Sequence, residues 1–335
     1  MERIGYLDAI KGFAIILVVI GHVLAWNFHD LNVMMHPLCV EDIKFGLLWN
    51  LIYSFHMALF FMVSGYLVNF TGKSKKIFIK KKIHRLLIPY ITTGFIILVV
   101  RGHYGYWFFL SLFELFTLAA LIDYALSKNN SKSDIIKNFS LVLVLWGVLY
   151  LIHRSISFDT NIGDFGKFIS YYPAFMLGFL MRKHQALFEK LIIRNNYSLY
   201  FISFLFLFSL HYCYLLPFPI FISKLLVNVS SIAIQLIGSL FIFNLFNHTP
   251  PDSVIHKNFS KVGRYSMDIY VFHILFVMSI PQIGPFIRDN LNFVSSICLQ
   301  ICFSLAFTAF AIMASIVVAK FVRRSILLNK ILLGN

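Results

Sequence analysis

Charged residues are scarce in this chain. Of its 335 residues only 13% are Asp, Glu, Lys or Arg, while 59% are hydrophobic, and the mean hydropathy is +0.80. Soluble globular domains carry about 25% charged residues, so this class is excluded. Apolar stretches of nearly 20 residues, the length that a helix needs to cross a bilayer, recur along the whole chain. They are continuous rather than alternating, which does not favour a transmembrane β-barrel.

Cysteine is scarce as well. The four cysteines do not show the spacing of a metal site, so we predict no bound metal. Two of them, Cys298 and Cys302, lie one helical turn apart within an apolar run, where we expect both to pack against neighbouring helices. The first apolar run also lacks a clear small-residue cleavage site, so we expect it to remain in the chain as a helix.

Ten apolar stretches follow one another along the sequence. We therefore predict an all-α polytopic membrane protein in which residues 1–335 form a single integral-membrane domain. No internal repeat is visible. The expected spans cover residues 7–28, 46–70, 83–101, 106–126, 138–153, 168–182, 197–215, 225–246, 265–284 and 293–320.

Basic residues are unequally divided between the two sides of these spans. The two termini and the loops 71–85, 127–137, 182–196 and 247–264 together carry 23 of the 29 Lys and Arg residues. Because Lys and Arg accumulate in cytoplasmic loops, both termini are predicted to be cytoplasmic. The net charge of +15 thus reflects topology, and nucleic acid is not an expected partner. The segment "GKSKKIFIKKKIHR" alternatively serves as a plain anchor on anionic lipid.

Ionisable residues stand inside the first span, where a charge costs about 3 kcal/mol on insertion scales. The stretch "YLDAIKGFAIILVVIGH" places Asp8, Lys11 and His22 on one helix face, with His22 roughly 16 Å further along than Lys11. Lys11 is either a functional cation at the cytoplasmic mouth or a side chain that snorkels to lipid headgroups. His22 is either a functional group or a hydrogen-bonded packing residue.

The second span carries a second histidine at a similar predicted depth. In "SFHMALFFMVSGY", His56 lies roughly 15 Å below the outer surface. Ser64 and Gly65 lie nearer the cytoplasm. They are candidates for the site, but small residues also mark close helix crossings in membranes.

The fourth and ninth spans each carry a polar stripe. Trp107, Ser111 and Glu114 share one face of the fourth span, and Glu114 is the only acidic residue well inside a predicted span. A carboxylate there either functions or completes a structural ion pair. In the ninth span, Tyr270 and His273 lie on one face.

Four helices therefore each place a titratable group near mid-membrane, which favours one shared polar cavity: His22, His56, Glu114 and His273. Histidines suit proton transfer near neutral pH. At the cytoplasmic side, three basic residues form a mouth that suits an anionic, phosphate-bearing ligand: Lys11, Lys82 and Arg85.

The order of these motifs is similar to that of the acyltransferase-3 family of membrane O-acyltransferases. The pieces that carry the resemblance are "YLDAIKGFAIILVVIGH", "FHMALFFMVSGYL", "KKKIHRLLIPY", "YWFFLSLF", "YYPAFMLGFLMRK" and "VGRYSMDIYVFH". They span nearly the whole chain. A lysine followed by glycine in the first piece resembles a fucose- and glucan-acetylase-like branch.

The resemblance implies a reaction and its partners. Acetyl-CoA is bound from the cytoplasm as the acyl donor, with no permanently bound cofactor. The acetyl group passes to a hydroxyl of a cell-surface polysaccharide or its lipid-linked precursor, in the inner (plasma) membrane and beside glycan-assembly proteins. The family's pair of a basic residue and a histidine corresponds to Lys11 and His22, and its basic-x-x-Arg pattern to Lys82 and Arg85. Lys11 stands where many members have arginine, and it acts as a point charge rather than a bidentate donor.

The resulting hypothesis assigns roles to these residues. CoA phosphates dock on Lys11, Lys82 and Arg85, and His22 acts as general base or as nucleophile. Further roles, in holding a tautomer, moving a proton, stabilising the oxyanion or binding substrate, fall to Glu114, His56, Tyr270, His273, Ser64 and Trp107. A proton-coupled transporter or polysaccharide exporter is the alternative, because central polar groups serve transport too.

The charge distribution makes a direct prediction of topology. In a background without the native cysteines, a cysteine at position 130 should react with an impermeant reagent only in permeabilised cells. A cysteine at position 160 should react in intact spheroplasts. The reverse pattern contradicts the predicted orientation and every depth assigned above.

Overall fold

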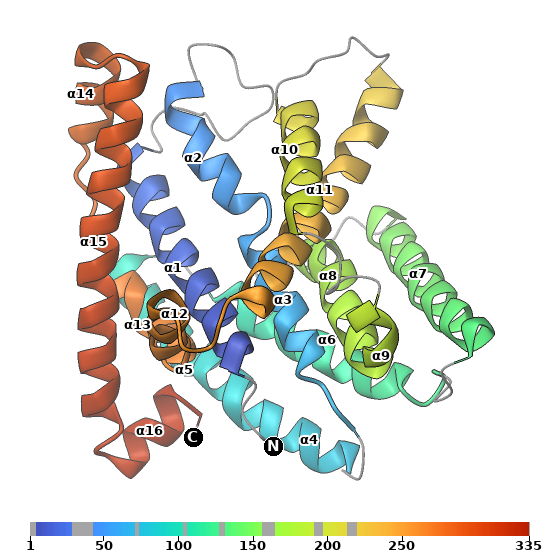
Figure 1. The fold of residues 1–335 in the computed structure, drawn as a ribbon. Helices are drawn as coiled ribbons and strands as arrows, with labels where there is room; N and C mark the ends of the chain where they lie inside the picture. Colours follow the sequence, from blue (N-terminus) through green and yellow to red (C-terminus); the bar gives the residue numbers. More distant parts are fainter. Residues whose placement is uncertain are drawn as a thin grey trace. The chain divides into compact units, whose positions relative to one another are not determined.

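The computed structural model describes residues 5–28, 43–70, 74–102, 106–126, 131–155, 165–190, 197–212 and 220–334. All regular elements in these ranges are helical (Figure 1). The chain divides into two compact units. Unit 1 comprises residues 1–59 and 196–320, and unit 2 comprises residues 60–195 and 321–335.

Unit 1 is built from the chain's first helices and most of its C-terminal half. Its elements are α1 (Gly5–Phe28), α2 (Ile43–Tyr53), the start of α3 (His56–Tyr66), α10 (Tyr197–Tyr212), α11 (Ile220–His248), α12 (Val254–Gly263), α13 (Ser266–Phe276), α14 (Ile283–Asn290) and nearly all of α15 (Phe293–Val322). In this unit α1 packs on α12, α11, α13 and α2, and α10 pairs with α11.

Unit 2 takes the middle of the chain and its last helix. It holds the rest of α3, α4 (Lys75–Lys82), the π-helical turn η2 (Ile83–Leu87), α5 (Ile88–Arg101), α6 (Trp107–Ile122), α7 (Lys132–Ser155), α8 (Phe165–Lys183), α9 (Gln185–Phe188) and α16 (Ile326–Leu332). Here α8 packs on α6 and α7, and α16 packs on α5.

The predicted helical membrane class is confirmed. Within the described residues, six helical stretches are long and apolar enough to cross a bilayer: Gly5–Phe28, Gly46–Tyr66, Lys75–Arg101, Lys132–Ser155, Val229–His248 and Phe293–Val322. Three shorter apolar helices are Trp107–Ile122, Tyr197–Tyr212 and Ser266–Phe276. The count of ten spans and the cytoplasmic termini stay predictions.

The second predicted span is interrupted in its middle. α2 ends at Tyr53 and α3 begins at His56, with a turn at Ser54 and Phe55 between them. The carbonyl of Ile52 accepts a hydrogen bond from the Phe55 N–H (3.3 Å), and the His56 ring nitrogen Nδ1 lies 2.8 Å from the same oxygen. The His56 side chain therefore takes part in closing the break.

The predicted ninth span, residues 265–284, is wrong as a continuous helix. α13 ends at Phe276, Val277 is extended, and a turn at Pro281 and Gln282 leads into α14, which begins at Ile283. Pro281 explains the end, because it has no N–H and its ring would clash with the carbonyl four residues before it. The freed backbone is bound by α1: the Asn27 amide donates to the Met278 carbonyl (3.0 Å) and accepts from the Ile280 N–H (2.7 Å). In addition, the expected loop 247–264 contains helix α12.

Helices α1 and α12 touch backbone to backbone. A Cβ atom at Gly12 would overlap the carbonyl oxygen of Phe259, and one at Gly263 would overlap the carbonyl oxygen of Asp8. Each glycine thus lies against the other helix's main chain, and α1 and α12 approach more closely than side chains would permit.

Unit 2 contains a second crossing of the same kind. A Cβ atom at Gly65 of α3 would overlap the carbonyl oxygen of Phe175, and one at Gly178 of α8 would overlap that of Met62. The interpretation of Gly65 as the mark of a close helix crossing is therefore confirmed. The partner glycine lies within "YYPAFMLGFLMRK".

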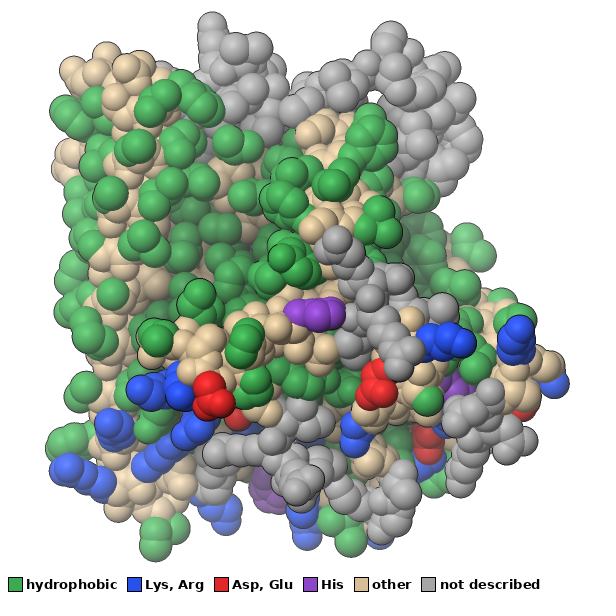
Figure 2. Space-filling view, in the orientation of Figure 1, with side chains coloured by type: hydrophobic (Ala, Val, Ile, Leu, Met, Phe, Trp, Pro, Cys, Tyr) green, Lys and Arg blue, Asp and Glu red, His purple; other side chains and the backbone are tan. Residues whose placement is uncertain are grey.

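Large apolar side chains cover the outer helix faces, as expected where lipid is the solvent. Figure 2 shows hydrophobic side chains along α15, with Lys and Arg side chains below it. Cys298 and Cys302 lie on exposed positions of this helix, so the expectation that they pack against neighbouring helices is wrong. Cys39 and Cys213 lie outside the described residues.

The crossing in unit 2 predicts a contrast between two helical glycines. Gly178→Ala forces α3 and α8 apart and should destabilise the protein by about 1–3 kcal/mol or more. Gly147 of α7 has open space around its would-be Cβ atom, so Gly147→Ala should be neutral or stabilise by up to about 1 kcal/mol. Detergent melting curves of both variants decide the matter, and equal melting temperatures contradict the crossing.

Candidate functional site

Helix α1 and the segment 254–280 run side by side in the same direction within unit 1. Gly12 meets Gly263 at one point, and ten residues further along both chains His22 meets His273. Beyond them, Asn27 binds Met278. In each of these three pairs the residue numbers differ by 251. The glycine crossing therefore sets the register that brings the two histidines together.

His22 and His273 form a close ring pair. Their ring centroids lie 5.2 Å apart with an interplanar angle of 34°. His273 is fully buried, and its Nδ1 atom lies 2.9 Å from the carbonyl oxygens of both Ile269 and Tyr270. Its Nε2 atom is buried and has no hydrogen-bond partner among the described residues. A buried nitrogen of this kind is rare and calls for a functional explanation.

His56 joins the pair from the break between α2 and α3. It interacts electrostatically with His22, and its ring packs edge-on against Tyr53 at 4.7 Å. Tyr53 in turn lies against Gly21, where a Cβ atom would come within 2.7 Å of the tyrosine ring. The "GH" pair of α1 therefore has two functions: Gly21 admits Tyr53, and His22 faces His273. The three predicted histidines are thus brought together in unit 1.

Backbone carbonyls select one tautomer for two of the three histidines. Because a carbonyl oxygen only accepts, the Nδ1 atoms of His56 and His273 must carry the hydrogen. In the neutral form their Nε2 atoms then hold a lone pair and accept rather than donate. Donation to an oxyanion, as predicted for His56 and as one option for His273, accordingly requires the protonated ring.

Lys11 is engaged in an ion pair. Its Nζ atom lies 2.6 Å from a carboxylate oxygen of Asp8, one turn earlier in α1, and both side chains are largely buried. The stripe predicted from the sequence is therefore present, with the charge of Lys11 compensated by Asp8. A phosphate at this position would compete with the Asp8 carboxylate.

Of the remaining predicted site residues, Tyr270 lies in unit 1 with its ring 5.8 Å from that of His273, and those on α3 and α6 belong to unit 2. Trp107 stacks on Tyr171 at 5.5 Å, and Tyr171 stacks on Phe61 at 4.8 Å, which makes a three-ring column. On the same α6 face as Trp107, Ser111 is buried and Glu114 is half-buried. Ser64, also half-buried, directly precedes the glycine of the α3–α8 crossing. A cavity that Glu114 shares with the histidines stays a prediction.

Lys82 and Arg85 differ in environment. The Lys82 Nζ atom lies 3.6 Å above the Phe116 ring and 5.1 Å above the Phe78 ring, so Lys82 is held by aromatic faces. Arg85 is exposed and sits within the π-helical turn η2. The sequence spacing did not indicate this turn.

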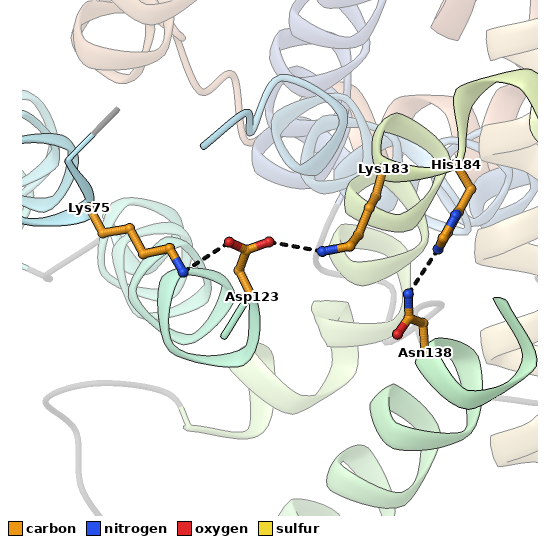
Figure 3. Close-up of polar contacts among 5 residues, drawn as sticks. All are labelled: Lys75, Asp123, Asn138, Lys183 and His184. Carbon is orange, nitrogen blue, oxygen red and sulfur yellow. Dashed lines mark hydrogen bonds and ion pairs between the residues drawn. The ribbon is translucent and has the colours of Figure 1, made fainter. Parts of the chain in front are cut away.

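A half-buried carboxylate links the ends of three helices in unit 2 (Figure 3). Asp123, directly after α6, pairs with Lys75 of α4 (2.9 Å) and Lys183 of α8 (3.0 Å). Burial acts to raise the pKa of the Asp123 carboxyl, but the hydrogen bonds and charges of Lys75 and Lys183 outweigh it and hold the pKa below its usual value. Our sequence reasoning missed this cluster, because its members are far apart in the chain.

The neighbouring histidine of unit 2 is structural rather than part of the histidine cluster. The Asn138 amide of α7 donates to the Nε2 atom of His184 at 3.0 Å (Figure 3). Burial, with the nearby charge of Lys183, lowers the pKa of His184, while Asp134 acts in the opposite direction. A neutral ring suits its role as acceptor and ties α7 to the end of α8.

A row of polar residues on α15 also escaped the sequence reasoning. Ser296, Gln300, Ser304 and Thr308 recur every four residues and are all buried in unit 1. The hydroxyls of Ser296, Ser304 and Thr308 have no hydrogen-bond partner among the described residues. Their spacing of one helical turn was the signal that could have revealed an inward-facing stripe.

The described residues define a helical membrane protein with a cluster of three histidines, of which His56 and His273 are buried. A family model described as an acyltransferase domain matches residues 4–317 of the chain. The chain therefore belongs to the acyltransferase-3 family, as its motifs predicted, and is a membrane acyltransferase. Neither the curated proteins nor the solved structures contain a match. The fucose- and glucan-acetylase-like branch stays a prediction.

The two-lysine environment of Asp123 predicts a pH-dependent stability. Asp123→Asn should lower the melting temperature, because it leaves two largely buried lysines without their partner. Since the pKa of Asp123 is lowered by folding, its contribution is complete above the ordinary carboxyl pKa and is lost as pH falls through the lowered value. The wild type and the variant should therefore differ near pH 7, and the difference should shrink only as pH falls below about 4, through the lowered pKa.

A matched control lies on an exposed ion pair. Asp252 pairs with Lys257 at 3.5 Å, but the Asp252 side chain is 98% exposed, so Asp252→Asn should leave the melting temperature unchanged. An Asp123→Asn variant that melts like Asp252→Asn at pH 7 contradicts the structural role of the cluster.

Proposed function

We propose that this acyltransferase moves an acetyl group from cytoplasmic acetyl-CoA to a hydroxyl of a cell-surface polysaccharide or its lipid-linked precursor. The observation that carries the proposal is the cluster of His22, His56 and His273 on three helices of unit 1. Acyl transfer to a hydroxyl requires a base that removes its proton and later returns one to the leaving thiolate, and imidazole is suited to both steps.

His22 is the central base in this proposal. It removes the proton of the acceptor hydroxyl as the oxygen attacks the thioester carbon. When the tetrahedral intermediate collapses, the C–S bond breaks, the ester forms and the thiolate takes up the proton as CoA. In a second route, a ring nitrogen of His22 first attacks the thioester and carries the acetyl group, which then passes to the acceptor hydroxyl.

The two other histidines support His22. His56 and His273 donate Nδ1–H to backbone carbonyls, so their rings are held in orientation and their Nε2 atoms are acceptors in the neutral form. The ring centroids of His273 and His22 lie 5.2 Å apart. We assign His273 the role of accepting the proton that His22 takes from the acceptor hydroxyl. Tyr270 is the remaining hydroxyl donor proposed for the oxyanion.

The donor is bound through its phosphates in this proposal. Lys11, Lys82 and Arg85 are the cations that the family resemblance implies for CoA. Of these, Arg85 is exposed, while Lys11 is paired with Asp8 and Lys82 lies on aromatic rings. Arg85 is therefore the most exposed of these three cations. Its planar guanidinium can bind phosphate oxygens in a bidentate manner.

The acceptor is assigned to residues of unit 2. The column of Trp107, Tyr171 and Phe61 offers an aromatic face of the kind on which a sugar ring can lie. Glu114 and Ser64 are proposed as polar groups for the acceptor hydroxyls. The proposed location is the inner (plasma) membrane, with glycan-assembly proteins as partners. Acetyl-CoA is the acyl donor, and no permanently bound cofactor is proposed. Family membership favours this reaction over the transporter or exporter alternative.

Two substitutions in α1 separate donor binding from chemistry. His22→Ala should reduce acetyl transfer by about 10²–10⁴-fold at any donor concentration, because positioned proton transfer is lost. Lys11→Ala should raise the apparent KM for acetyl-CoA and leave kcat nearly unchanged. Glycan acetylation and calorimetric CoA binding, measured on the same preparations, report both quantities.

Two controls make this test specific. His211→Ala removes another buried histidine of unit 1 that bonds Ser230 outside the cluster, and it should retain transfer. Asp8→Asn removes the carboxylate of the ion pair and keeps the Lys11 ammonium group. If Asp8→Asn reproduces the KM effect of Lys11→Ala, Lys11 only completes an ion pair. Near-normal transfer by His22→Ala contradicts the proposed mechanism.

A further inference from the structure

The helix from Lys75 to Arg101 is irregular at the basic motif. Residues Ile83–Leu87 form a π-turn, closed by a hydrogen bond from the Ile88 N–H to the Ile83 carbonyl five residues earlier. Pro89 follows directly. In a regular α-helix the Pro89 ring would clash with the carbonyl of Arg85. Pro89 also has no N–H that could donate a hydrogen bond to that carbonyl. The wider π-turn therefore accommodates Pro89, and its irregular backbone includes Arg85.

The last helix of the chain docks on this turn with one end only. The Thr92 hydroxyl oxygen of α5 lies 2.7 Å from the Ile331 carbonyl oxygen and 2.9 Å from that of Ile88, so its one hydrogen is shared between them, and Leu333 is fully buried. At the opposite end of α16, Ile326 and Leu327 are largely exposed. The contacts with α5 and the π-turn therefore come from residues 331–334, at and just after the end of α16.

Gly334 makes the closest approach. Its φ angle is +65°, and a Cβ atom there would overlap the carbonyl oxygen of His84 and come within 2.7 Å of the Arg85 Cα atom. Only glycine combines this left-handed backbone with contact of main chain against main chain. The segment therefore presses on the π-turn at the residue that carries the candidate phosphate-binding guanidinium.

We propose that residues 331–334 are a positioning element that holds the π-turn and thereby aims Arg85 at the anionic part of the acyl donor. The proposal rests on the proposed function, because Arg85 is assigned to the CoA phosphates there. Gly334 acts through Arg85 and is a positioning residue.

The chain supplies a matched control for the test. Gly102, at the end of α5, also has a left-handed backbone (φ +75°), but nothing lies within 4 Å of its would-be Cβ atom. Gly102→Ala and Gly334→Ala impose similar conformational strain, and only Gly334→Ala adds the clash with the π-turn. Any difference between the two variants reports the contact with His84 and Arg85.

The experiment measures amide hydrogen exchange over residues 83–90 and calorimetric CoA binding for the full chain in detergent. Gly334→Ala should speed exchange in this peptide and weaken CoA binding by about three- to tenfold, with kcat little changed. Gly102→Ala should match the wild type in both. Thr92→Val should act like Gly334→Ala, and Thr92→Ser, which keeps the hydroxyl, should restore the wild-type values.

The outcomes separate this inference from the proposed function. Unchanged exchange in both Gly334→Ala and Thr92→Val overturns the positioning element. Faster exchange with unaltered CoA affinity overturns its link to Arg85. A wild type that fails to bind CoA at all overturns the donor assignment, while the exchange data still test the contact between α16 and the π-turn.

Discussion

The contact on which the histidine cluster depends is the backbone-to-backbone crossing of α1 and α12 at Gly12 and Gly263. Two helices that touch through their main chains have one relative position, because any side chain at the crossing would push them apart. From this point α1 and the segment 254–280 continue in parallel, so His22 and His273 meet ten residues later. Asn27 fixes the far end by binding the unwound backbone after α13.

The apolar surroundings explain why backbone carbonyls bind two of the histidines. With little water available, polar groups are satisfied by the protein itself, and carbonyls of the same chain bind the Nδ1 atoms of His56 and His273. The consequence is chemical as well as structural, since the tautomer is fixed and the basic lone pair is left on Nε2. The Nε2 atom of His273, which has no hydrogen-bond partner among the described residues, is the kind of buried polar group that costs stability.

The sequence was sufficient for the helical class, the family, the grouping of three histidines and the crossing at Gly65, because hydropathy and helical spacing report which faces are buried. It was insufficient where backbone geometry departs from a regular helix. Pro281 ended α13 early, Pro89 widened the turn at Arg85, and the turn at Ser54 and Phe55 was invisible to spacing. Asp123 was missed because its lysines come from distant helices.

We propose that the enzyme uses its histidine cluster to transfer an acetyl group from acetyl-CoA to a sugar hydroxyl. The most direct measurement follows purified protein in lipid vesicles supplied with acetyl-labelled acetyl-CoA and a hydroxyl-bearing glycan, and it quantifies free CoA and labelled glycan ester together. Free CoA and labelled glycan ester should appear in equal amounts, and the formation of both should depend on His22. Movement of the glycan across the membrane without ester formation, or CoA release without labelled glycan at any acceptor concentration, would contradict the proposal.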